Sequence, residues 1–413
     1  MESMEQKALK MHKDNVGKIA VHSKVKVRTS EDLTLAYSPG VAEPCKKIHE
    51  NPKDIYTYTN KGNYVAVVSD GTAVLGLGDI GAEAGLPVME GKAVLFKTFG
   101  GVDAFPICVG TKDVDEIVHL VKLLEPTFGG VNLEDISAPR CFEIEEKLKA
   151  ICNIPIFHDD QHGTAIIATA CLLNCLKLTH RDISEIKVVV NGAGAAAIAI
   201  AKLWLHYGVK NLILVDSKGM IYEGREGLNK EKTALAKRTN QEKRQGDLAE
   251  AMKGADIFLG VSVAGVVTKE MIRSMAKDPI ILALANPVPE IMPEDAFEAG
   301  AYVVCTGRSD FPNQVNNVLA FPGIFRGALD VEASVINEEM KIAAANALAN
   351  AVGEKLSKDC VIPHSLDTNV APQVAMAVAK AALETGVARR TDRTPEMVYK
   401  RCQEMMLLGK DWI

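Results

Sequence analysis

The sequence lacks the marks of secreted, membrane-spanning and nucleic-acid-binding proteins. Its nine cysteines are scattered and include no C-x-x-C pair, so neither a disulfide framework nor a cysteine-based zinc site is indicated. No apolar run approaches the ~20 residues that span a bilayer, and the opening MESMEQKALKMHKDN has no apolar leader core. The net charge is −6, without a basic stripe for nucleic acid. We expect a cytoplasmic protein with reduced thiols that binds neither membranes nor nucleic acid.

Two series of short β-branched runs alternate with helical patterns along the 413 residues. The first series is YVAVVSDG, DAFPICV, GGVNLED and IPIFHDD, and the second is IKVVVNGAG, NLILVDSKG, ADIFLGVS, IILALANP and YVVCTG. This alternation predicts parallel sheets covered on both faces. We expect an α/β fold with an N-terminal α/β domain over residues 1–162. A doubly wound, Rossmann-type domain would follow over residues 163–413, with C-terminal helical segments from about residue 328.

Two glycine motifs compete as the site for a dinucleotide pyrophosphate. GLGDIG, residues 76–81, matches G-x-G-x-x-G in every position, but the glycines and proline of the following AEAGLPVMEGKA predict that no long helix forms there. GAGAAA, residues 192–197, lies between a strand pattern and an unbroken helix pattern, and Asp216 ends the next strand 22 residues after Gly194. We expect the second motif to bind the cofactor and the first to form a tight turn that approaches another ligand.

Adjacent carboxylates end two strands of the first series. Glu134 and Asp135 end GGVNLED, and Asp159 and Asp160 end IPIFHDD. Carboxyl ends of parallel strands meet at one edge of a sheet, and carboxylates gathered there need a cation to neutralise them. Their hard oxygen donors predict Mg²⁺ or Mn²⁺. Solvated carboxylates without a metal remain the alternative.

Other residues near these motifs are candidates for a role at the site. His158 and His162 would instead flank a zinc site, although adjacent acids favour a harder cation. Lys92, in PVMEGKAVLFK, is either a surface lysine or a base whose pKa is lowered near the acids and a metal. Tyr37, in AYSPG, lies at a Pro-Gly turn.

Together these pieces resemble malic enzyme in its small bacterial-type form, along nearly the whole chain. The matching segments, in order, are LAYSPGVAEPC, VVSDGTAVLGLGDIGAEAGLPVMEGKA, GGVNLEDISAPRCFEIE, PIFHDDQHGTAI, NGAGAAAIA, ILALANPVPEI and TGRSDFPNQVNNVLAFPGIFRGAL. Their combined length and order make the resemblance specific.

The resemblance implies metal-dependent oxidative decarboxylation of (S)-malate to pyruvate and CO₂ with reduction of NAD(P)⁺, by a homodimer. Residues 1–162 would then bind substrate and metal, and residues 163–413 the cofactor. Tyr37 matches the general acid and Lys92 the general base, with Asp159 hydrogen-bonded to Lys92. The remaining implied positions are the Mg²⁺ or Mn²⁺ ligands Glu134, Asp135 and Asp160, the cofactor-binding Thr164, Gly192, Ala193, Gly194, Ala195, Ala196, Asp216, Ser217, Lys218, Val261, Ser262 and Asn286, and the substrate-binding Lys92, Asn286 and Asn317.

The sequence departs from the larger malic enzymes in the stretch DGTAVLGLG, two residues before LGLG. An arginine there binds a malate carboxylate in those enzymes, whereas this chain has Ala73. The candidate replacements are the backbone N–H groups of the glycine loop, Asn286 and Asn317.

The cofactor choice depends on Asp216 and the two residues after it. A carboxylate here suits the ribose hydroxyls of NAD and repels the extra phosphate of NADP. Ser217 and Lys218 would hydrogen-bond and neutralise that phosphate, so we favour NADP and keep NAD as the alternative.

Two other functions remain open. One is simple malate oxidation or conversion of malate to lactate without release of reduced cofactor. The other is a nucleotide-sensing protein that has lost catalysis, against which the intact Tyr37, Lys92 and three metal carboxylates argue.

Overall fold

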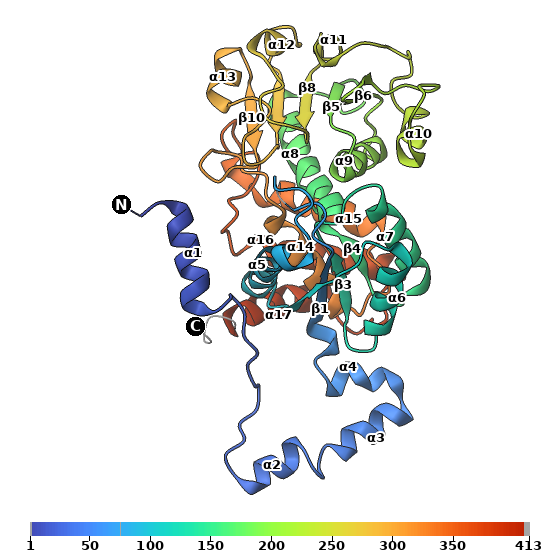
Figure 1. Cartoon of the computed structure of the whole chain (residues 1–413), viewed down its shortest axis with the longest axis vertical. Coiled ribbons are helices and arrows are strands. Elements are labelled where there is room, and N and C mark those ends of the chain that lie inside the picture. Colours follow the sequence, from blue (N-terminus) through green and yellow to red (C-terminus); the bar gives the residue numbers. More distant parts are fainter. Residues whose placement is uncertain (1, 75, 409–413) are drawn as a thin grey trace.

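The computed structural model describes residues 2–74 and 76–408. Two parallel sheets with their helices form the body of the molecule, and an N-terminal arm projects from it (Figure 1). The nine strands predicted from β-branched runs are confirmed, because each run contains one observed strand. The α/β fold with a Rossmann-type second sheet and C-terminal helices is likewise confirmed.

The first sheet has the strand order β2-β1-β3-β4, and all its pairs are parallel. Its strands are β1 (Tyr64–Ser69), β2 (Asp103–Cys108), β3 (Gly130–Leu133) and β4 (Ile156–His158). Helices α6 (Val114–Leu124) and α7 (Arg140–Ile151) cover one face with buried aliphatic side chains, and α5 (Ala82–Gly100) covers the other. Leu133 pairs with His158, so the acids after β3 and β4 emerge side by side.

Helix α5 corrects a prediction from the sequence. A long helix after GLGDIG was not expected, yet α5 continues for 19 residues through Gly85, Pro87 and Gly91. Ala82, Gly85, Met89, Ala93 and Phe96 recur at intervals of three or four residues on its buried face. The burial of this face outweighs the local preference of glycine and proline against a helix.

The second sheet has the strand order β10-β9-β8-β5-β6-β7. Its parallel strands are β5 (Lys187–Asn191), β6 (Asn211–Asp216), β8 (Ile257–Gly260), β9 (Ile280–Ala283) and β10 (Val303–Thr306), and the short β7 (Gly219–Met220) is antiparallel. Helices α8 (Thr164–Thr179) and α9 (Ala195–His206) cover one face. The other face carries α11 (Leu248–Met252), α12 (Lys269–Arg273) and α13 (Pro293–Glu298), and α10 (Lys230–Ala236) follows β7.

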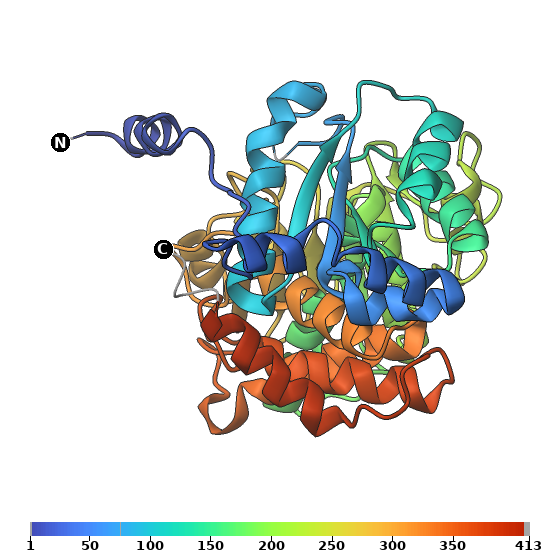
Figure 2. The same ribbon diagram turned by 90° about the horizontal axis from the view of Figure 1, so that it is seen from below.

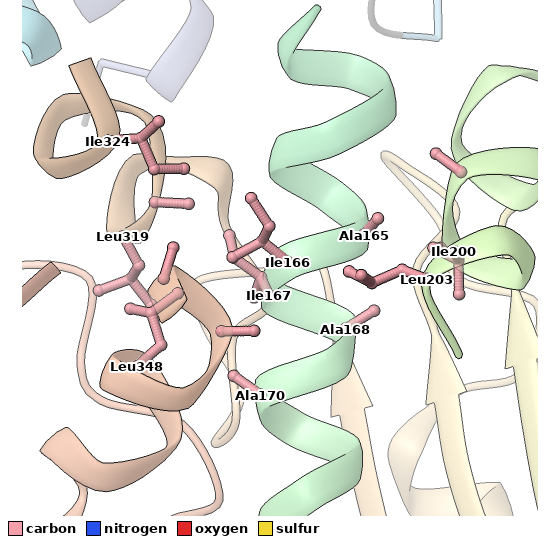
Figure 3. Packing of buried hydrophobic residues seen from close by; sticks show 14 of the residues in the cluster. Ala165, Ile166, Ile167, Ala168, Ala170, Ile200, Leu203, Leu319, Ile324 and Leu348 are labelled. Carbon is pink, nitrogen blue, oxygen red and sulfur yellow. The ribbon is translucent and has the colours of Figure 1, made fainter. Parts of the chain in front are cut away.

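Helix α8 joins the two halves through its packing. In Figure 3, Ile166 and Ile167 face Leu319, and Ala165 and Ala168 face Leu203 of α9. These side chains belong to one continuous core that reaches both sheets. The two halves therefore share a hydrophobic core through α8.

The C-terminal helices return to the first sheet. They are α14 (Phe321–Asp330), α15 (Glu338–Ala351), α16 (Val370–Glu384) and α17 (Pro395–Leu408), and they form a layer seen in Figure 2. The ring of Phe96 in α5 lies 4.6 Å from that of Phe321 and 5.2 Å from that of Phe325, centroid to centroid. This aromatic contact fixes the start of α14 beside α5.

The N-terminal arm carries α1 (Met4–Asn15), α2 (Ser30–Ala36), α3 (Ala42–Glu50) and α4 (Ile55–Tyr58). None of these four helices has a buried residue, and α2 and α3 project beyond the body (Figure 1). Over residues 2–74 and 76–408, no helix combines the length and hydropathy needed to cross a bilayer.

Candidate active site

Three carboxylates meet at the carboxyl edge of the first sheet. One oxygen from each of Glu134, Asp135 and Asp160 lies within 4.8 Å of the others. The backbone of Asp135 is left-handed, at φ 53°, and its N–H donates to Asp160 Oδ2 at 2.8 Å. Strained backbone of this kind is held only by its surroundings and concentrates at functional sites. Asp135 Oδ2 is buried and has no hydrogen-bond partner among the described residues, so the cluster forms an oxygen cage suited to a hard cation.

Lys92 of α5 bridges the acids that follow the two strands. Its Nζ lies 2.8 Å from Glu134 Oε1 and 2.7 Å from Asp159 Oδ2, with only 10% of the side chain exposed. The ammonium also sits 4.4 Å from the ring centroid of Phe321, a favourable cation–π contact. The structure therefore buries Lys92, so the surface-lysine alternative is wrong.

The pKa values at this edge follow from burial and crowding. Burial raises the pKa of Glu134 to about 8, and Lys92 only partly offsets it. Burial and the neighbouring acids raise the pKa of Asp135 and of Asp160 to about 7. Burial acts to lower the pKa of Lys92, but Asp159, Glu134 and Asp160 outweigh it and raise the pKa. The carboxylates by themselves therefore raise the pKa of Lys92, and the lowered pKa expected beside acids and a metal stays a prediction.

Asp159 is fixed by a single turn of π-helix that spans Asp159–Gly163 between β4 and α8. Its Oδ2 accepts from Lys92 and, at 3.0 Å, from Asn317 Nδ2. A Cβ atom at Gly163 would collide with Asp159 Oδ1, so only glycine fits there. Thr164, the first residue of α8, donates its hydroxyl to Asn317 Oδ1 at 3.2 Å. The segment of residues 159–164 and Asn317 thereby position the carboxylate that pairs with Lys92.

The histidines do not join the carboxylate cluster. His162 Nε2 lies 2.7 Å from Glu145 Oε1, and burial lowers the pKa of His158. Within the described residues the metal-binding group consists of oxygen donors alone. This geometry favours the magnesium or manganese hypothesis over zinc.

Tyr37 lies outside this constellation within a single chain. It caps the C-terminus of α2 in the projecting arm, and 70% of its surface is exposed. The structure brings together Lys92, Asp159, Asn317 and the three carboxylates, but not Tyr37.

The GAGAAA segment forms the turn between β5 and α9. Gly192 has φ 117°, and a Cβ atom there would lie 2.6 Å from the carbonyl oxygen of Val261, so this turn requires glycine. Gly194 is the N-cap of α9 and faces open space. Ala193, Ala195 and Ala196 surround it, half-buried. The free N-terminus of a long helix after a glycine turn is suited to a pyrophosphate.

Ser262 is held beside this turn by a buried carboxylate. Asn191 donates to Ser262 Oγ at 2.8 Å, and Ser262 donates through N and Oγ to Glu290 Oε1 at 2.8 and 3.0 Å. Glu290 also accepts from Ala285 N, close to the exposed Asn286. Glu290 thus joins the loops that carry Ser262 and Asn286.

Asp216 ends β6 next to the glycine turn, and Gly192 N donates to Val215 O at 2.8 Å. Its Oδ2 accepts from Arg225 and from Lys232 Nζ, the latter at 2.9 Å, and its Oδ1 accepts from Lys218 N at 3.0 Å. Burial acts to raise the pKa of Asp216, but Arg225 and Lys232 lower it to about 2. Ser217 and the side chain of Lys218 are exposed beside it.

The GLGDIG loop packs against the second half of the molecule. A Cβ atom at Gly76 would lie 3.2 Å from the carbonyl oxygen of Asn286. Most N–H groups around the loop already bond to backbone oxygens: those of Ala73, Val74, Leu77, Gly78, Ile80 and Gly81. The loop backbone therefore offers few free donors for a carboxylate, which leaves Asn286 and Asn317 as the stronger candidates from the sequence.

Several residues with structural roles at these sites escaped the sequence analysis. Asn132 Nδ2 donates to Glu134 Oε2 at 2.6 Å, and Glu290, Arg225 and Lys232 act as described above. Of these residues, the sequence could have indicated Asn132, because a polar residue in a buried strand two positions before Glu134 points to the same face of the sheet.

Comparison with known proteins decides the family. The malic enzyme N-terminal domain matches residues 16–149, and the malic enzyme NAD-binding domain matches residues 161–383. The chain belongs to the malic enzyme family.

Individual malic enzymes match nearly the full chain. A bifunctional malic/malolactic enzyme of Bacillus subtilis is 66% identical over 99% of this chain and 100% of its own length. An NAD-dependent malic enzyme of Geobacillus stearothermophilus is 55% identical over 91% of this chain and 78% of its own. The malic enzyme structure from Pyrococcus horikoshii is 48% identical, with a TM-score of 0.96 over 100% of this chain and 98% of that one. Relatives named NADP-dependent malic enzymes also match, and this chain spans about half of their length.

Proposed function

We propose that this protein catalyses the oxidative decarboxylation of (S)-malate to pyruvate and CO₂ with reduction of NAD(P)⁺. The observation that carries the proposal is Lys92, buried between Glu134 and Asp159 at 2.8 and 2.7 Å, beside a cage of three carboxylates. A buried base next to a hard-cation cage is what removal of a hydroxyl proton followed by decarboxylation requires.

The residues present fit a divalent cation at Glu134, Asp135 and Asp160. Burial and mutual repulsion raise the pKa of all three carboxyls, and Lys92 offsets this only in part; within the described residues Asp135 Oδ2 has no hydrogen-bond partner. Mg²⁺ or Mn²⁺ held there would stabilise the negative charge that decarboxylation builds on a substrate oxygen. Asn132 and the backbone N–H of Asp135 orient two of the three carboxylates.

Lys92 is proposed to take the proton of the malate C2 hydroxyl at its Nζ, once a cation held by Glu134, Asp135 and Asp160 neutralises the acids that otherwise raise the pKa of Lys92. Asp159 and Asn317 hold that atom in place through the contacts described above. Asn317 and Asn286 supply amide donors for a substrate carboxylate in place of the arginine that Ala73 replaces. NAD(P)⁺ bound at the GAGAAA turn would accept the hydride from C2.

The exposed arm supports a homodimer in which Tyr37 of one subunit serves the site of the other. Leu33, Leu35 and Tyr37 are 53, 69 and 70% exposed on an arm without buried residues. A helix that buries nothing within its own chain gains little from propensity alone, so a second copy is proposed to cover it. Tyr37 would then protonate C3 of the enolpyruvate in the partner's site.

Mixing two inactive variants tests this arrangement. Lys92→Ala and Tyr37→Phe chains, denatured and refolded together, should recover about one quarter of wild-type turnover, because half of the dimers are mixed and each mixed dimer has one intact site. If mixed dimers form but no turnover is recovered, Tyr37 acts in its own subunit.

The cofactor is proposed to be NADP in preference to NAD. The support is the positive charge around Asp216, where Arg225 and Lys232 outnumber the carboxylate and Lys218 adds a third cation. NAD remains the alternative, because two of the relatives are named NAD-dependent malic enzymes.

An assay of all products tests the reaction. Malate with Mn²⁺ and each cofactor should give pyruvate, CO₂ and reduced cofactor in equal amounts, and no turnover with EDTA. Accumulation of oxaloacetate without pyruvate would contradict the proposed decarboxylation. Cofactor binding without malate turnover would favour a nucleotide-sensing protein.

Conversion of malate to lactate is a second candidate function. Its support is the 66% identical relative named a bifunctional malic/malolactic enzyme. Lactate formed from malate without net reduced cofactor would establish it, and its absence at full malate consumption would exclude it.

The division of labour along the chain is part of the proposal. Residues 1–162 would supply the substrate and metal groups, and residues 163–413 the cofactor site and, from about residue 328, the C-terminal helices. A cytoplasmic setting is supported by the nine cysteines, all of which are unpaired.

A further inference from the structure

The π-helical turn that carries Asp159 and Asp160 is anchored by a buried carboxylate of helix α7. His162 Nε2 of this turn lies 2.7 Å from Glu145 Oε1, and Gln161 Nε2 makes a longer contact of 3.5 Å with Glu145 Oε2. The side chain of Glu145 is 8% exposed. One buried carboxylate thus contacts two consecutive side chains of the turn.

A buried lysine fixes the orientation of the His162 ring. Lys341 of α15 has a side chain that is 6% exposed, and its Nζ lies 3.4 Å from His162 Nδ1. An ammonium only donates hydrogen bonds, so Nδ1 accepts and Nε2 carries the proton that it donates to Glu145. The ring also lies 5.5 Å from that of Phe157 in β4, centroid to centroid. Contacts from α7, α15 and β4 therefore hold His162 in one tautomer and one position.

The same turn carries the acids that face the opposite set of partners. Asp159 Oδ2 lies 2.7 Å from Lys92 Nζ, and Asp160 Oδ2 accepts from the backbone N–H of Asp135 at 2.8 Å. The two residues that follow these acids contact Glu145. Since all four side chains belong to one short turn, a shift at Glu145 moves the two acids as well. Turns of this kind occur often at functional sites.

We infer that Glu145 is a positioning residue that holds Asp160 in the carboxylate cage and Asp159 against Lys92, acting through His162. This inference rests on the proposed function and goes beyond it by naming a residue outside the cage that sets the cage's geometry. A carboxylate withdrawn from His162 would leave a buried N–H without its acceptor, which is costly. The turn would move to regain a partner, and the acids would move with it.

Mn²⁺ binding in the absence of malate and cofactor tests this role. Glu145→Asp keeps the charge but shortens the side chain by one methylene, so Mn²⁺ affinity should fall at least about tenfold, the scale on which groups that orient metal ligands act. Glu145→Gln keeps the reach and an acceptor for His162, so affinity should stay within about threefold of wild type. Titration followed by electron paramagnetic resonance measures both. Wild-type affinity of Glu145→Asp, or an equal loss in Glu145→Gln, would overturn the inference.

Two control variants separate positioning from general stability. Glu146→Ala removes the neighbouring acid of α7, which is 69% exposed and pairs with Lys230 at 3.0 Å, so Mn²⁺ affinity should not change. Asn174→Ala removes a buried amide of α8 that donates to two backbone carbonyls at 2.9 Å each. It should lower the melting temperature without changing Mn²⁺ affinity. If it weakens Mn²⁺ binding as much as Glu145→Asp does, the effect at Glu145 is structural and the inference fails.

A double-mutant cycle tests the route through His162. If the two residues act as one unit, Glu145→Ala, His162→Ala and the double variant should weaken Mn²⁺ binding by about the same factor. Factors that multiply in the double variant would show independent effects and contradict the route.

Turnover distinguishes failure of this inference from failure of the proposed function. At saturating Mn²⁺, Glu145→Asp should lower kcat at least about tenfold, because Asp159 also positions Lys92, while the cofactor affinity stays within about twofold. A wild type that binds Mn²⁺ without converting malate would contradict the proposed function alone. Full Mn²⁺ affinity and turnover of Glu145→Asp would contradict this inference alone.

Discussion

Two aspartates at the ends of parallel strands have opposite environments. Asp160 follows β4 and shares its edge with Glu134, Asp135 and Asp159, against the single ammonium of Lys92. Asp216 ends β6 and pairs with two cations, Arg225 and Lys232. The pKa of Asp160 is raised to about 7, whereas that of Asp216 is lowered to about 2.

The difference shows that position in the fold does not by itself assign a carboxylate its role. Both residues lie where an α/β sheet gathers ligands. An excess of acids after β3 and β4 favours a cation at that edge, and an excess of basic side chains around the end of β6 favours an anion there. The balance of neighbouring charges therefore predicts the sign of the ligand at each edge.

Removal of the Lys92 ammonium from the acidic edge should have the largest effect on turnover of the changes at either edge. Lys92→Ala should lower turnover by about 10³-fold, because a positioned base contributes on that order, while cofactor affinity stays within twofold. Lys97→Ala is the matched control, since Lys97 lies on the same helix and pairs with Asp103 at 2.7 Å. Steady-state kinetics with calorimetry of the cofactor measures both, and near-normal turnover of Lys92→Ala would remove it from the mechanism.

Loss of one acid at that edge should weaken cation binding. Asp160→Asn should reduce Mn²⁺ affinity by at least about tenfold, measured by titration followed by calorimetry or electron paramagnetic resonance. Asp79→Asn is the control, because Asp79 is an exposed acid of the nearby loop that pairs with Lys112 at 2.6 Å. Unchanged Mn²⁺ affinity of Asp160→Asn would show that the carboxylate cage is not the metal site.

The sequence predicted the acidic edge better than the basic one. Strand patterns placed Glu134, Asp135 and Asp160 at the ends of two strands of one sheet, and the structure shows the three acids together because those strands are neighbours. Arg225 and Lys232 follow Asp216 by 9 and 16 residues through a loop and a short helix with no periodicity that points to Asp216. Contacts of this kind depend on how a loop folds back, which spacing alone does not encode.

Helix α5 and Lys92, which lies on it, show a second feature that the sequence alone could not predict. Gly85, Pro87 and Gly91 argue locally against a helix, and only the buried face formed by distant partners such as Phe321 makes it stable. The direction of the Lys92 pKa shift likewise depends on three acids from two strands. Tertiary packing decided both outcomes.

The pH dependence of the free energy of unfolding should show whether the carboxyls of the acidic edge have raised pKa values. Asp135 and Asp160 have a folded pKa of about 7, above the ~3.9 of an unfolded aspartate. Between these values the folded state binds more protons, so the free energy of unfolding falls as pH rises from about 4 to 7. Melting temperatures in EDTA should therefore drop more for wild type than for Asp160→Asn over pH 5 to 7.5.

Saturating Mn²⁺ should reverse that trend, because the cation binds the deprotonated carboxylates. The gain in melting temperature on adding Mn²⁺ should grow with pH for wild type and stay small for Asp160→Asn. Parallel pH curves for the two proteins in EDTA would contradict the raised pKa values.

Neutralising the acid at the basic edge should have the smallest effect, in the opposite direction. Asp216→Asn removes the one negative charge beside two cations, so affinity for adenosine 2′,5′-bisphosphate should rise by no more than about threefold, the scale of a partly exposed charge contact. AMP affinity should change less than twofold, because both oxygens of Asp216 are already engaged by Lys218, Arg225 and Lys232. A large loss of AMP affinity would instead show that Asp216 binds the ribose hydroxyls. Asp160 and Asp216 would then still differ in pKa, but Asp216 would not mark an edge that favours an anion.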